Sequence, residues 1–206
     1  MSASLRRAVL AALLLAGATA GAADRPAFAP RTDLPIDLDA ASSEFDRRNE
    51  RLVFRNLKIT QGPMRITADL GEATRVDFEN ALWVFRGNVV IDNQGARVFC
   101  DEAELTFVGH ELRSAALTGN PARFEHLRNG AQRTEGHSGL IEYDVSTATI
   151  RLSRDAWLSD GANEVSGDRI AYDLRREYVT ADAGGSGQVR MRIKPPERNR
   201  QEEAAP

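Results

Sequence analysis

The sequence predicts an all-β domain, and three observations support that prediction. Between residues 35 and 194, hydrophobic and polar residues alternate in short runs, which is the period of a strand with one buried face. Turn-forming residues separate these runs, as in NQG at 93–95 and AGGSG at 183–187. The runs also recur as a repeated unit, and helical periodicity is almost absent from this part of the chain.

The repeated unit is seen when five stretches are aligned on one anchor position. The anchors are Asp39, Asp69, Asp101, His137 and Asp168, so by subtraction they lie 30, 32, 36 and 31 residues apart. Hydrophobic or small residues recur three and one positions before the anchor and, more variably, four and six positions after it. Because these two sets differ in parity, a bulge or a corner at the anchor is needed to bring them to one side. We favour a corner, with the acidic side chain accepting hydrogen bonds from backbone donors.

Each unit continues, after a turn, into a second alternating run. These second runs cover residues 51–59, 82–91, 112–119, 148–158 and 177–181, and a last run covers 188–194. Ten or more antiparallel strands in one layered domain are therefore expected. Repeats of this length are equally compatible with the stacked coils of a solenoid, and periodicity alone does not separate the two.

The two ends of the chain are expected to lie outside this domain. Residues 1–22 have two arginines, an apolar run and then small residues, which is the pattern of a cleavable signal peptide. Residues 23–34 are rich in proline and predict an extended lead-in, and residues 195–206 are charged and predict a disordered tail. Residues 35–194 then form one domain, large enough to bury a core without a disulfide, since Cys100 is the only cysteine.

The sequence lacks the residue patterns that are typical of an enzyme. The histidines His110, His126 and His137 lie in or beside turns and have no metal-ligand spacing to one another. The aspartates recur because the unit recurs, so a catalytic pair of carboxylates is not expected. No glycine-rich phosphate-binding motif precedes a helix. Neither catalytic residues, a metal nor a cofactor is therefore predicted.

Cys100 and the net charge argue against two further functions, namely thiol chemistry and nucleic-acid binding. Cys100 stands in a column that holds Leu, Ala or Gly in the other units, so we interpret it as a small buried hydrophobic residue. A reactive thiol would need a basic neighbour, and the next residue is Asp101. The formal net charge is −3, which gives no broad basic face, so nucleic acid is not an expected partner.

The aligned columns do not decide whether the interior of the domain is solid or hollow. The inward columns mix bulky residues with small ones such as Ala68 and Gly136. Such a mixture is compatible with a solid core and equally with a trough that holds a long apolar ligand.

A resemblance to a known family adds to this interpretation. Residues 119–181 resemble the C-terminal half of the LptA/OstA-like family of periplasmic lipopolysaccharide transport proteins. The segments that carry the resemblance are NPARF, EGHSGLIEYD, SGDRIAYD and the run to VRMRIKP. Upstream, NLKITQGPMRITAD at 56–69 resembles a strand pair of the same family.

The resemblance implies a twisted β-jelly roll that is open at both ends. Such domains associate head to tail in the periplasm. They bridge the inner-membrane and outer-membrane components of lipopolysaccharide transport, which carry similar β-jelly-roll domains. The acyl chains of lipid A travel along the apolar interior, so the expected function is a non-catalytic lipopolysaccharide-binding bridge. The residues expected to line the interior are Ile36, Leu38, Ile66, Ala68, Val98, Phe107, Phe124, Tyr143, Val145, Val165 and Tyr172.

Two alternatives stay open at this point. The first is the membrane-anchored component of the same pathway, with the apolar residues 8–20 retained as an anchor. The second is a solenoid-type extracellular protein that binds or acts on polysaccharide.

Overall fold

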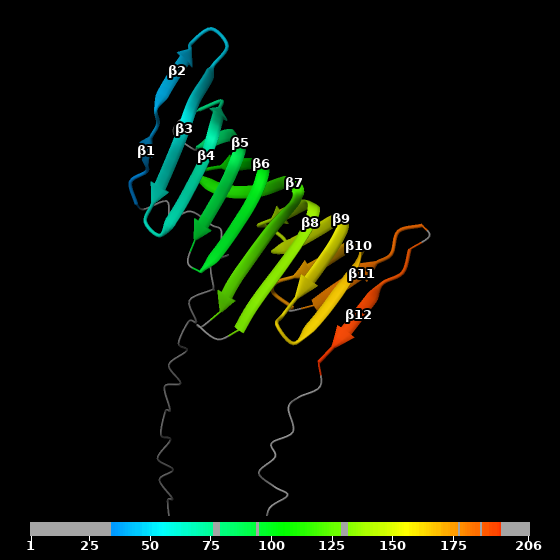
Figure 1. Cartoon of the computed structure of the whole chain (residues 1–206). Helices are drawn as coiled ribbons and strands as arrows, with labels where there is room; N and C mark the ends of the chain where they lie inside the picture. The colour runs from blue at the N-terminus through cyan, green and yellow to red at the C-terminus, as the bar shows by residue number, and fades with distance from the viewer. Residues whose placement is uncertain are drawn as a thin grey trace, which may run out of the picture.

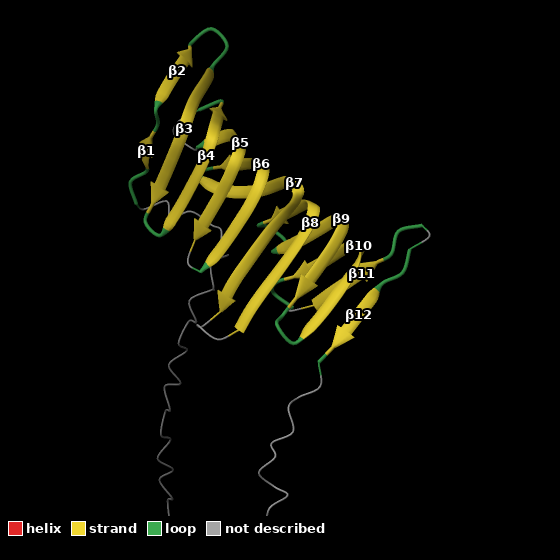
Figure 2. Ribbon diagram, viewed as in Figure 1, coloured by secondary structure: helices red, strands yellow, loops and turns green. Residues whose placement is uncertain are grey.

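A computed structural model describes residues 34–75, 79–93, 95–128, 132–176, 178–185 and 187–194. The predicted signal peptide, nearly all of the lead-in and the predicted tail lie outside these residues. Within them, the chain forms twelve strands in a single sheet whose pairings are all antiparallel (Figure 2). The predicted all-β class is confirmed. Among the described residues, no helix has the length and hydrophobicity needed to cross a membrane.

The strands follow one another in the sheet almost in chain order. They are β1 (Asp37–Asp39), β2 (Ser42–Asp46), β3 (Arg51–Gln61), β4 (Met64–Ala73), β5 (Asn80–Asn93), β6 (Ala96–Val108), β7 (Glu111–Arg128), β8 (Gln132–Asp144), β9 (Thr149–Ser159), β10 (Asn163–Asp173), β11 (Tyr178–Asp182) and β12 (Arg190–Ile193). β1 and β2 both pair with β3, and β11 and β12 both pair with β10. Figure 1 shows the strands stacked along one long axis, with β1 and β2 at one end and β11 and β12 at the other.

The central strands are longer than the alternating runs that the sequence indicates. β7 has 18 residues and contains both the run at 112–119 and the NPARF segment. Its pairing with β8 shifts register between Thr118 and Ala122, so one strand bends there and continues. Two runs that look separate in the sequence are therefore two halves of one strand, because backbone pairing resumes on both sides of the corner.

The register shifts lie at the predicted corners in three of the five units. Asp69, Asp101 and Asp168 each fall inside a shift, between β4 and β5, β6 and β7, and β10 and β9 respectively. At the first of these corners a side-chain amide is the donor, since Asn88 Nδ2 donates to Asp69 Oδ2 at 2.8 Å. Gly87 beside it has φ 74°, and a Cβ at this position would stand 2.5 Å from Asp69 Oδ2. The corner therefore needs glycine at residue 87.

The fourth unit requires a correction to the alignment. Gly136 pairs with Phe124, and Phe124 pairs with Val98. Gly136 is thus in the row of Val98, which lies three residues before its own corner. The corner position of this unit is Gly139, two residues after the predicted anchor His137.

The first unit is displaced in the same way. Leu38 pairs with Ile59, and Ile59 pairs with Ile66, so the corner position of this unit is Ala41 in place of Asp39. A shift of two residues keeps every side chain on the same face of a strand. Alternation in the sequence therefore reports the face correctly and leaves an even-numbered slip undetected.

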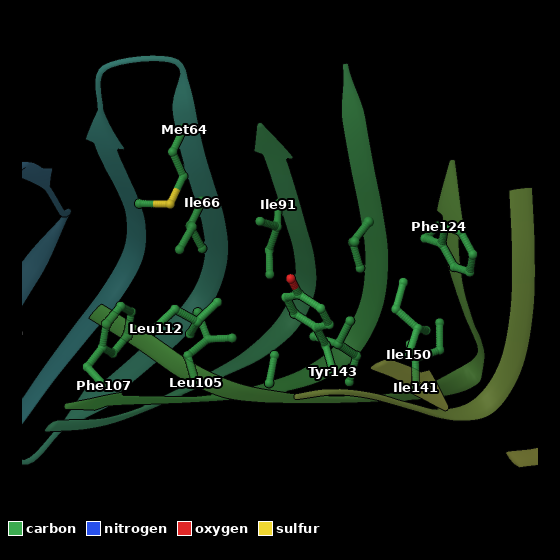
Figure 3. Close-up of a pocket in the computed structure, with 13 residues that line it drawn as sticks. Met64, Ile66, Ile91, Leu105, Phe107, Leu112, Phe124, Ile141, Tyr143 and Ile150 are labelled. Carbon is green, nitrogen blue, oxygen red and sulfur yellow. The ribbon is translucent and has the colours of Figure 1, made fainter. Parts of the chain in front are cut away.

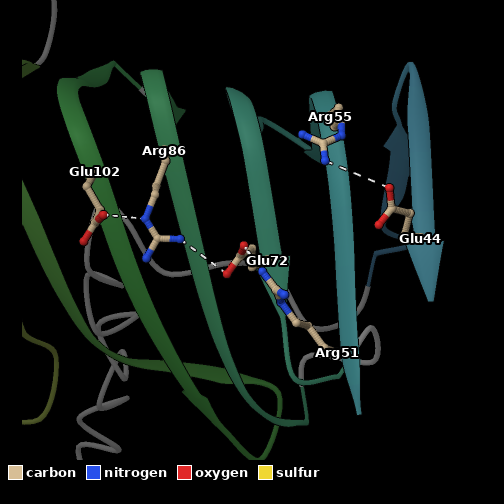
Figure 4. Close-up of polar contacts among 6 residues, drawn as sticks. All are labelled: Glu44, Arg51, Arg55, Glu72, Arg86 and Glu102. Carbon is tan, nitrogen blue, oxygen red and sulfur yellow. Dashed lines mark hydrogen bonds and ion pairs between the residues drawn. The ribbon is translucent and has the colours of Figure 1, made fainter. Parts of the chain in front are cut away.

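The outer face of the sheet carries ion pairs between neighbouring strands. Arg51 on β3 and Arg86 on β5 both contact Glu72 on β4, with N–O distances of 2.5 Å and 3.4 Å (Figure 4). Arg86 also donates to Glu102 on β6 at 2.6 Å. The neighbouring guanidinium of Arg51 holds the pKa of the Glu72 carboxyl below its usual value. These pairs leave the opposite face of the sheet to hydrophobic side chains.

Candidate functional site: an apolar groove between two walls

The interior is built from rows of hydrophobic residues that cross the whole sheet. Directly paired residues of an antiparallel sheet lie on the same face, so successive pairings define each row. One row lies on the side of the corners where β4, β6 and β10 begin. It consists of Leu38, Ile59, Ile66, Ile91, Val98, Phe124, Gly136, Leu158 and Val165. Beyond the corners, a second row consists of Leu52, Ala73, Trp83, Leu105, Ala115, Tyr143, Ile150 and Tyr172. We call the surfaces that carry these rows the first wall and the second wall.

The two walls face each other across an apolar groove. Figure 3 shows strands that curve from one wall into the other, with Met64, Ile66, Ile91 and Phe124 directed toward Leu105, Phe107 and Tyr143. The groove is lined by Met64, Ile66, Ile91, Val98, Leu105, Phe107, Leu112, Ala115, Leu117, Phe124, Ile141, Tyr143 and Ile150. Its unfilled volume is about 40 Å³, which is room for a few water-sized molecules. The side chains of the two walls thus nearly meet.

Five of the eleven predicted interior residues line this groove, namely Ile66, Val98, Phe107, Phe124 and Tyr143. Ala68 is buried in the same hydrophobic cluster at 6% exposure, without lining the groove itself.

The other five predicted residues lie toward the ends of the sheet. Leu38, Val145 and Val165 are half-buried and pack against the hydrophobic cluster. Tyr172 is half-buried and pairs with Ile150, so it faces the interior from the second wall. Ile36 comes just before β1 and is 38% exposed. That all eleven residues contact lipid stays a prediction.

Several groove residues were missed by the sequence prediction, among them Ile91 and Ile150. Both belong to the second run of a unit, and the aligned columns covered the first run only. The alternation in those second runs carries the missing signal, because strands on both sides of every hairpin contribute to the same face. Leu105 and Ile141 lie in the aligned columns and could have been chosen from them.

Two ionisable side chains face this interior in their neutral forms. Burial raises the pKa of Tyr143 to about 12. Burial also raises the pKa of Cys100 to about 12, and the nearby carboxylates of Asp101 and Glu102 add to the shift. Cys100 is 7% exposed and pairs with Val89 within the hydrophobic cluster. The interpretation of Cys100 as a small buried hydrophobic residue is confirmed.

The outer face of the sheet holds His137, the predicted anchor of the fourth unit. His137 stacks on Trp157 with ring centroids 5.1 Å apart. Partial burial and the charge of Arg123 lower its pKa. In the part of the chain that the structure describes, no three His, Cys, Asp or Glu residues are close enough together to hold a metal ion.

The rows end in exposed hydrophobic residues at both edges of the sheet. Of the ten exposed large hydrophobic residues among those described, seven lie in or beside the edge strands. At the first edge these are Ile36 and Phe45, and at the last edge they are Tyr178, Val179, Val189, Met191 and Ile193. Each edge strand pairs with only one other described strand. Both ends of the groove therefore finish in backbone and apolar groups that no other strand of the described residues covers.

The comparison with known proteins identifies the family. Residues 70–178, just over half of the chain, match the family of the LptA/(LptD N-terminal domain) LPS transport protein. The chain belongs to this family. The predicted membership of the LptA/OstA-like family is confirmed.

Individual relatives carry related names. The "Lipopolysaccharide export system protein LptA" of Escherichia coli (strain K12) is 27% identical over 176 residues, which cover 84% of this chain and 76% of the relative. The "Lipopolysaccharide export system protein LptH" of Pseudomonas aeruginosa is 25% identical over 129 residues, which cover 62% of this chain and 72% of the relative.

A solved structure supports the fold. The crystal structure of LptH, described as the LptA homologous periplasmic component of the conserved lipopolysaccharide transport device from Pseudomonas aeruginosa, matches with a TM-score of 0.54. The match covers 82% of this chain and all of that chain at 20% identity, so it shows the fold alone. The predicted twisted β-jelly roll of antiparallel strands is confirmed.

Proposed function

We propose that this protein is a non-catalytic periplasmic component of lipopolysaccharide transport. Its groove takes up the acyl chains of lipid A, and copies assemble head to tail between the inner-membrane and outer-membrane components of the pathway. The observation that carries the proposal is the pair of hydrophobic rows, one from β1 to β10 and the other from β3 to β10, with exposed apolar residues of the edge strands beyond their ends. Family membership and the names of the relatives support it.

The physical need for such rows follows from the chemistry of the cargo. Exposing a lipid chain to water costs ~0.8 kcal/mol of free energy per CH₂ group, or about 10 kcal/mol for a chain of twelve carbons. An apolar path from edge to edge removes this cost at each position along the way. The sugars and phosphates of the cargo stay outside the groove in water, so the carrier itself does not need a basic net charge.

The small unfilled volume implies that the walls separate when a chain enters. From β3 to β10 the strand order is a single path, so the described strands join the two walls through the corners and not through pairing at their far margins. A small change of angle at successive corners would widen the groove along its length. The interior side chains then exchange contacts with each other for contacts with the acyl chain, and the groove closes again when the cargo leaves.

Photo-crosslinking tests the groove directly. A benzophenone amino acid placed at Phe124 or Tyr143 is expected to capture lipopolysaccharide, because both side chains line the groove. The matched controls are Arg123 and Glu142, which adjoin these positions on the same strands and are exposed on the opposite face. Equal labelling of inward and outward positions would refute the groove as the cargo site.

The periplasmic location is part of the same proposal. It rests on the predicted signal peptide in residues 1–22 and on the periplasmic description of the LptH relative. The mass of the mature protein tests it: loss of about 22 residues is expected, whereas a mass that includes residues 8–20 would favour the membrane-anchored alternative.

A further inference from the structure

We infer that the joint between two copies of this chain has a defined register that is selected by charge. In this joint β12 of one copy pairs with β1 of the next, with Met191 opposite Leu38. The inference rests on the proposed head-to-tail assembly and specifies which residues meet. The partner is a second copy of this chain.

The direction of the edge strands permits this pairing. Every step of the sheet from β1 through β3 and on to β10 and β12 is antiparallel. Nine such steps separate β1 from β12, so the two strands run in opposite directions. A second copy that continues the sheet past β12 therefore presents its β1 in the antiparallel orientation, and no reversal of the molecule is needed.

The hydrophobic row fixes the register. Leu38 begins the row of the first wall, and at the far end Val165 of that row pairs with Met191. Continuing the row into the next copy places Met191 opposite Leu38 of that copy. Two residues further along, Ile193 then stands opposite Ile36. Met191 and Ile193 are 66% and 68% exposed in the single chain, so the joint covers a large apolar area.

In this register the charged residues of the two edges become cross-strand pairs. Antiparallel pairing of Met191 with Leu38 sets Arg190 opposite Asp39 and Arg192 opposite Asp37. The outward positions of β1 are thus acidic, and those of β12 are basic. Opposite charges directly across two strands stabilise their pairing, and like charges destabilise it.

The charges within each copy suit this arrangement. Asp39 Oδ2 lies 2.8 Å from Lys58 Nζ, and Arg192 Nη1 lies 3.4 Å from Glu164 Oε2. At the joint, Asp39 would stand between Lys58 of its own copy and Arg190 of the other, and Arg192 would stand between Glu164 of its own copy and Asp37 of the other. Asp37 and Arg190 are paired with the neutral residues Thr60 and Ser166 within their own copy, so the joint would give each of them its charged cross-strand partner. The rows of alternating charge on the outer face would therefore continue across the boundary.

The second wall leads to the same register. Phe45 on β2 pairs with Leu52 in the second row, and Val179 on β11 pairs with Tyr172 at the other end of that row. Continuing the row places Val179 opposite Phe45 of the next copy. Phe45 is 58% exposed in the single chain and would be covered there. Both walls thus continue together when the two copies are joined.

The charges also set the polarity of assembly. A joint between two first edges would bring Asp37 and Asp39 against their own copies, and a joint between two last edges would bring Arg190 and Arg192 together. Repulsion disfavours both. Only the head-to-tail contact is complementary, and such a heterologous contact can be repeated along a filament.

Charge reversal tests the inference. The variants Asp37→Arg/Asp39→Arg and Arg190→Asp/Arg192→Asp are each expected to self-associate about tenfold to a hundredfold more weakly, since two attractive pairs become repulsive. An equimolar mixture of the two is expected to assemble again, and so is the chain that carries all four changes. Sedimentation velocity over a range of protein and salt concentrations measures this, and circular dichroism checks that each variant is folded.

Three outcomes would overturn the inference. They are a wild-type chain that stays monomeric, reversed variants that assemble as well as the wild type, and folded variants whose mixture does not assemble. The test for cargo is separate, because a monomeric variant still contains the groove. If a charge-reversed variant does not assemble as predicted but still captures lipopolysaccharide at Phe124, the inferred joint is wrong and the carrier function stands. If assembly follows the prediction but no lipopolysaccharide is captured, the groove is refuted as the cargo site and the inferred joint stands.

Disulfide formation tests the register residue by residue. In a Cys100→Ala background, Leu38→Cys with Met191→Cys is expected to give a covalent ladder on oxidation, because directly opposed residues lie within the reach of a disulfide. The pair Leu38→Cys with Ile193→Cys is two positions out of register and is the matched control. A ladder from the control pair and none from the first pair would contradict the register.

Discussion

The central and edge strands are made from similar alternating sequence and differ in what they bury. Trp83 and Phe85 in β5 are completely buried, whereas every residue of β2 and of β12 is exposed. The sequence of β12, RMRI, alternates as cleanly as that of any central strand. Alternation therefore provides a strand with one apolar face, and burial of that face depends on neighbours. In the centre the neighbours belong to the same chain, and at the edges we propose that another copy supplies them.

The largest expected contrast is between an aromatic residue of the centre and one of the edge. Trp83 stacks on Phe54 and Phe85, with centroid distances of 6.0 Å and 5.7 Å. Trp83→Ala is expected to lower the free energy of unfolding by about 3–5 kcal/mol. Phe45→Ala is expected to cost less than about 1 kcal/mol in the monomer, because Phe45 is 58% exposed. Denaturant unfolding of monomeric protein measures both, and equal losses would remove the distinction between centre and edge.

A smaller contrast is expected between two glycines that face corner aspartates. Gly87 and Gly184 have φ values of 74° and 65°, and a Cβ would meet Asp69 Oδ2 at 2.5 Å and Asp168 Oδ2 at 3.0 Å. Gly87→Ala is expected to cost about 2 kcal/mol, through backbone strain together with the clash. Gly184 lies between the edge strands β11 and β12, and Gly184→Ala is expected to lower the free energy of unfolding by about half as much. A larger loss at Gly184 would show that the edge corner is the more rigid one.

The smallest contrast concerns ion pairs and their dependence on pH. The pKa of Glu72 is lowered in the folded state, chiefly by Arg51, so its stabilising contribution is present above the unfolded pKa and is lost as pH falls through the folded pKa. Glu72→Gln is expected to reduce stability by up to about 1 kcal/mol at pH 7, with the difference from wild type shrinking as pH falls through the lowered pKa of the folded state. Glu164→Gln, whose partner Arg192 is 77% exposed, is expected to change monomer stability by less than about 0.5 kcal/mol. Unfolding curves at several pH values check both, and a pH-independent effect of Glu72→Gln would contradict the electrostatic explanation.

Sequence reasoning predicted the faces of the sheet better than its corners and its groove. The parity change around Asp69, Asp101 and Asp168 correctly predicted a bend in those strands. It placed the corners of the first and fourth units two residues too early, at Asp39 and His137 in place of Ala41 and Gly139. A slip of two residues leaves the pattern of faces unchanged, so the alternation did not reveal it. The groove residues Ile91 and Ile150 were missed because the columns followed one run of each unit.

The sequence by itself determined the class of structure, the repeat, the faces of the strands and the neutral, buried role of Cys100. These follow from local alternation and composition, which each strand carries in its own residues. Only the tertiary structure decided which residues meet across the groove, how narrow it is, and which of the described strands pair with a single neighbour. Those properties depend on the register between strands and on the angle at each corner. Both are set by contacts between residues far apart in the chain, and no single stretch of sequence contains them.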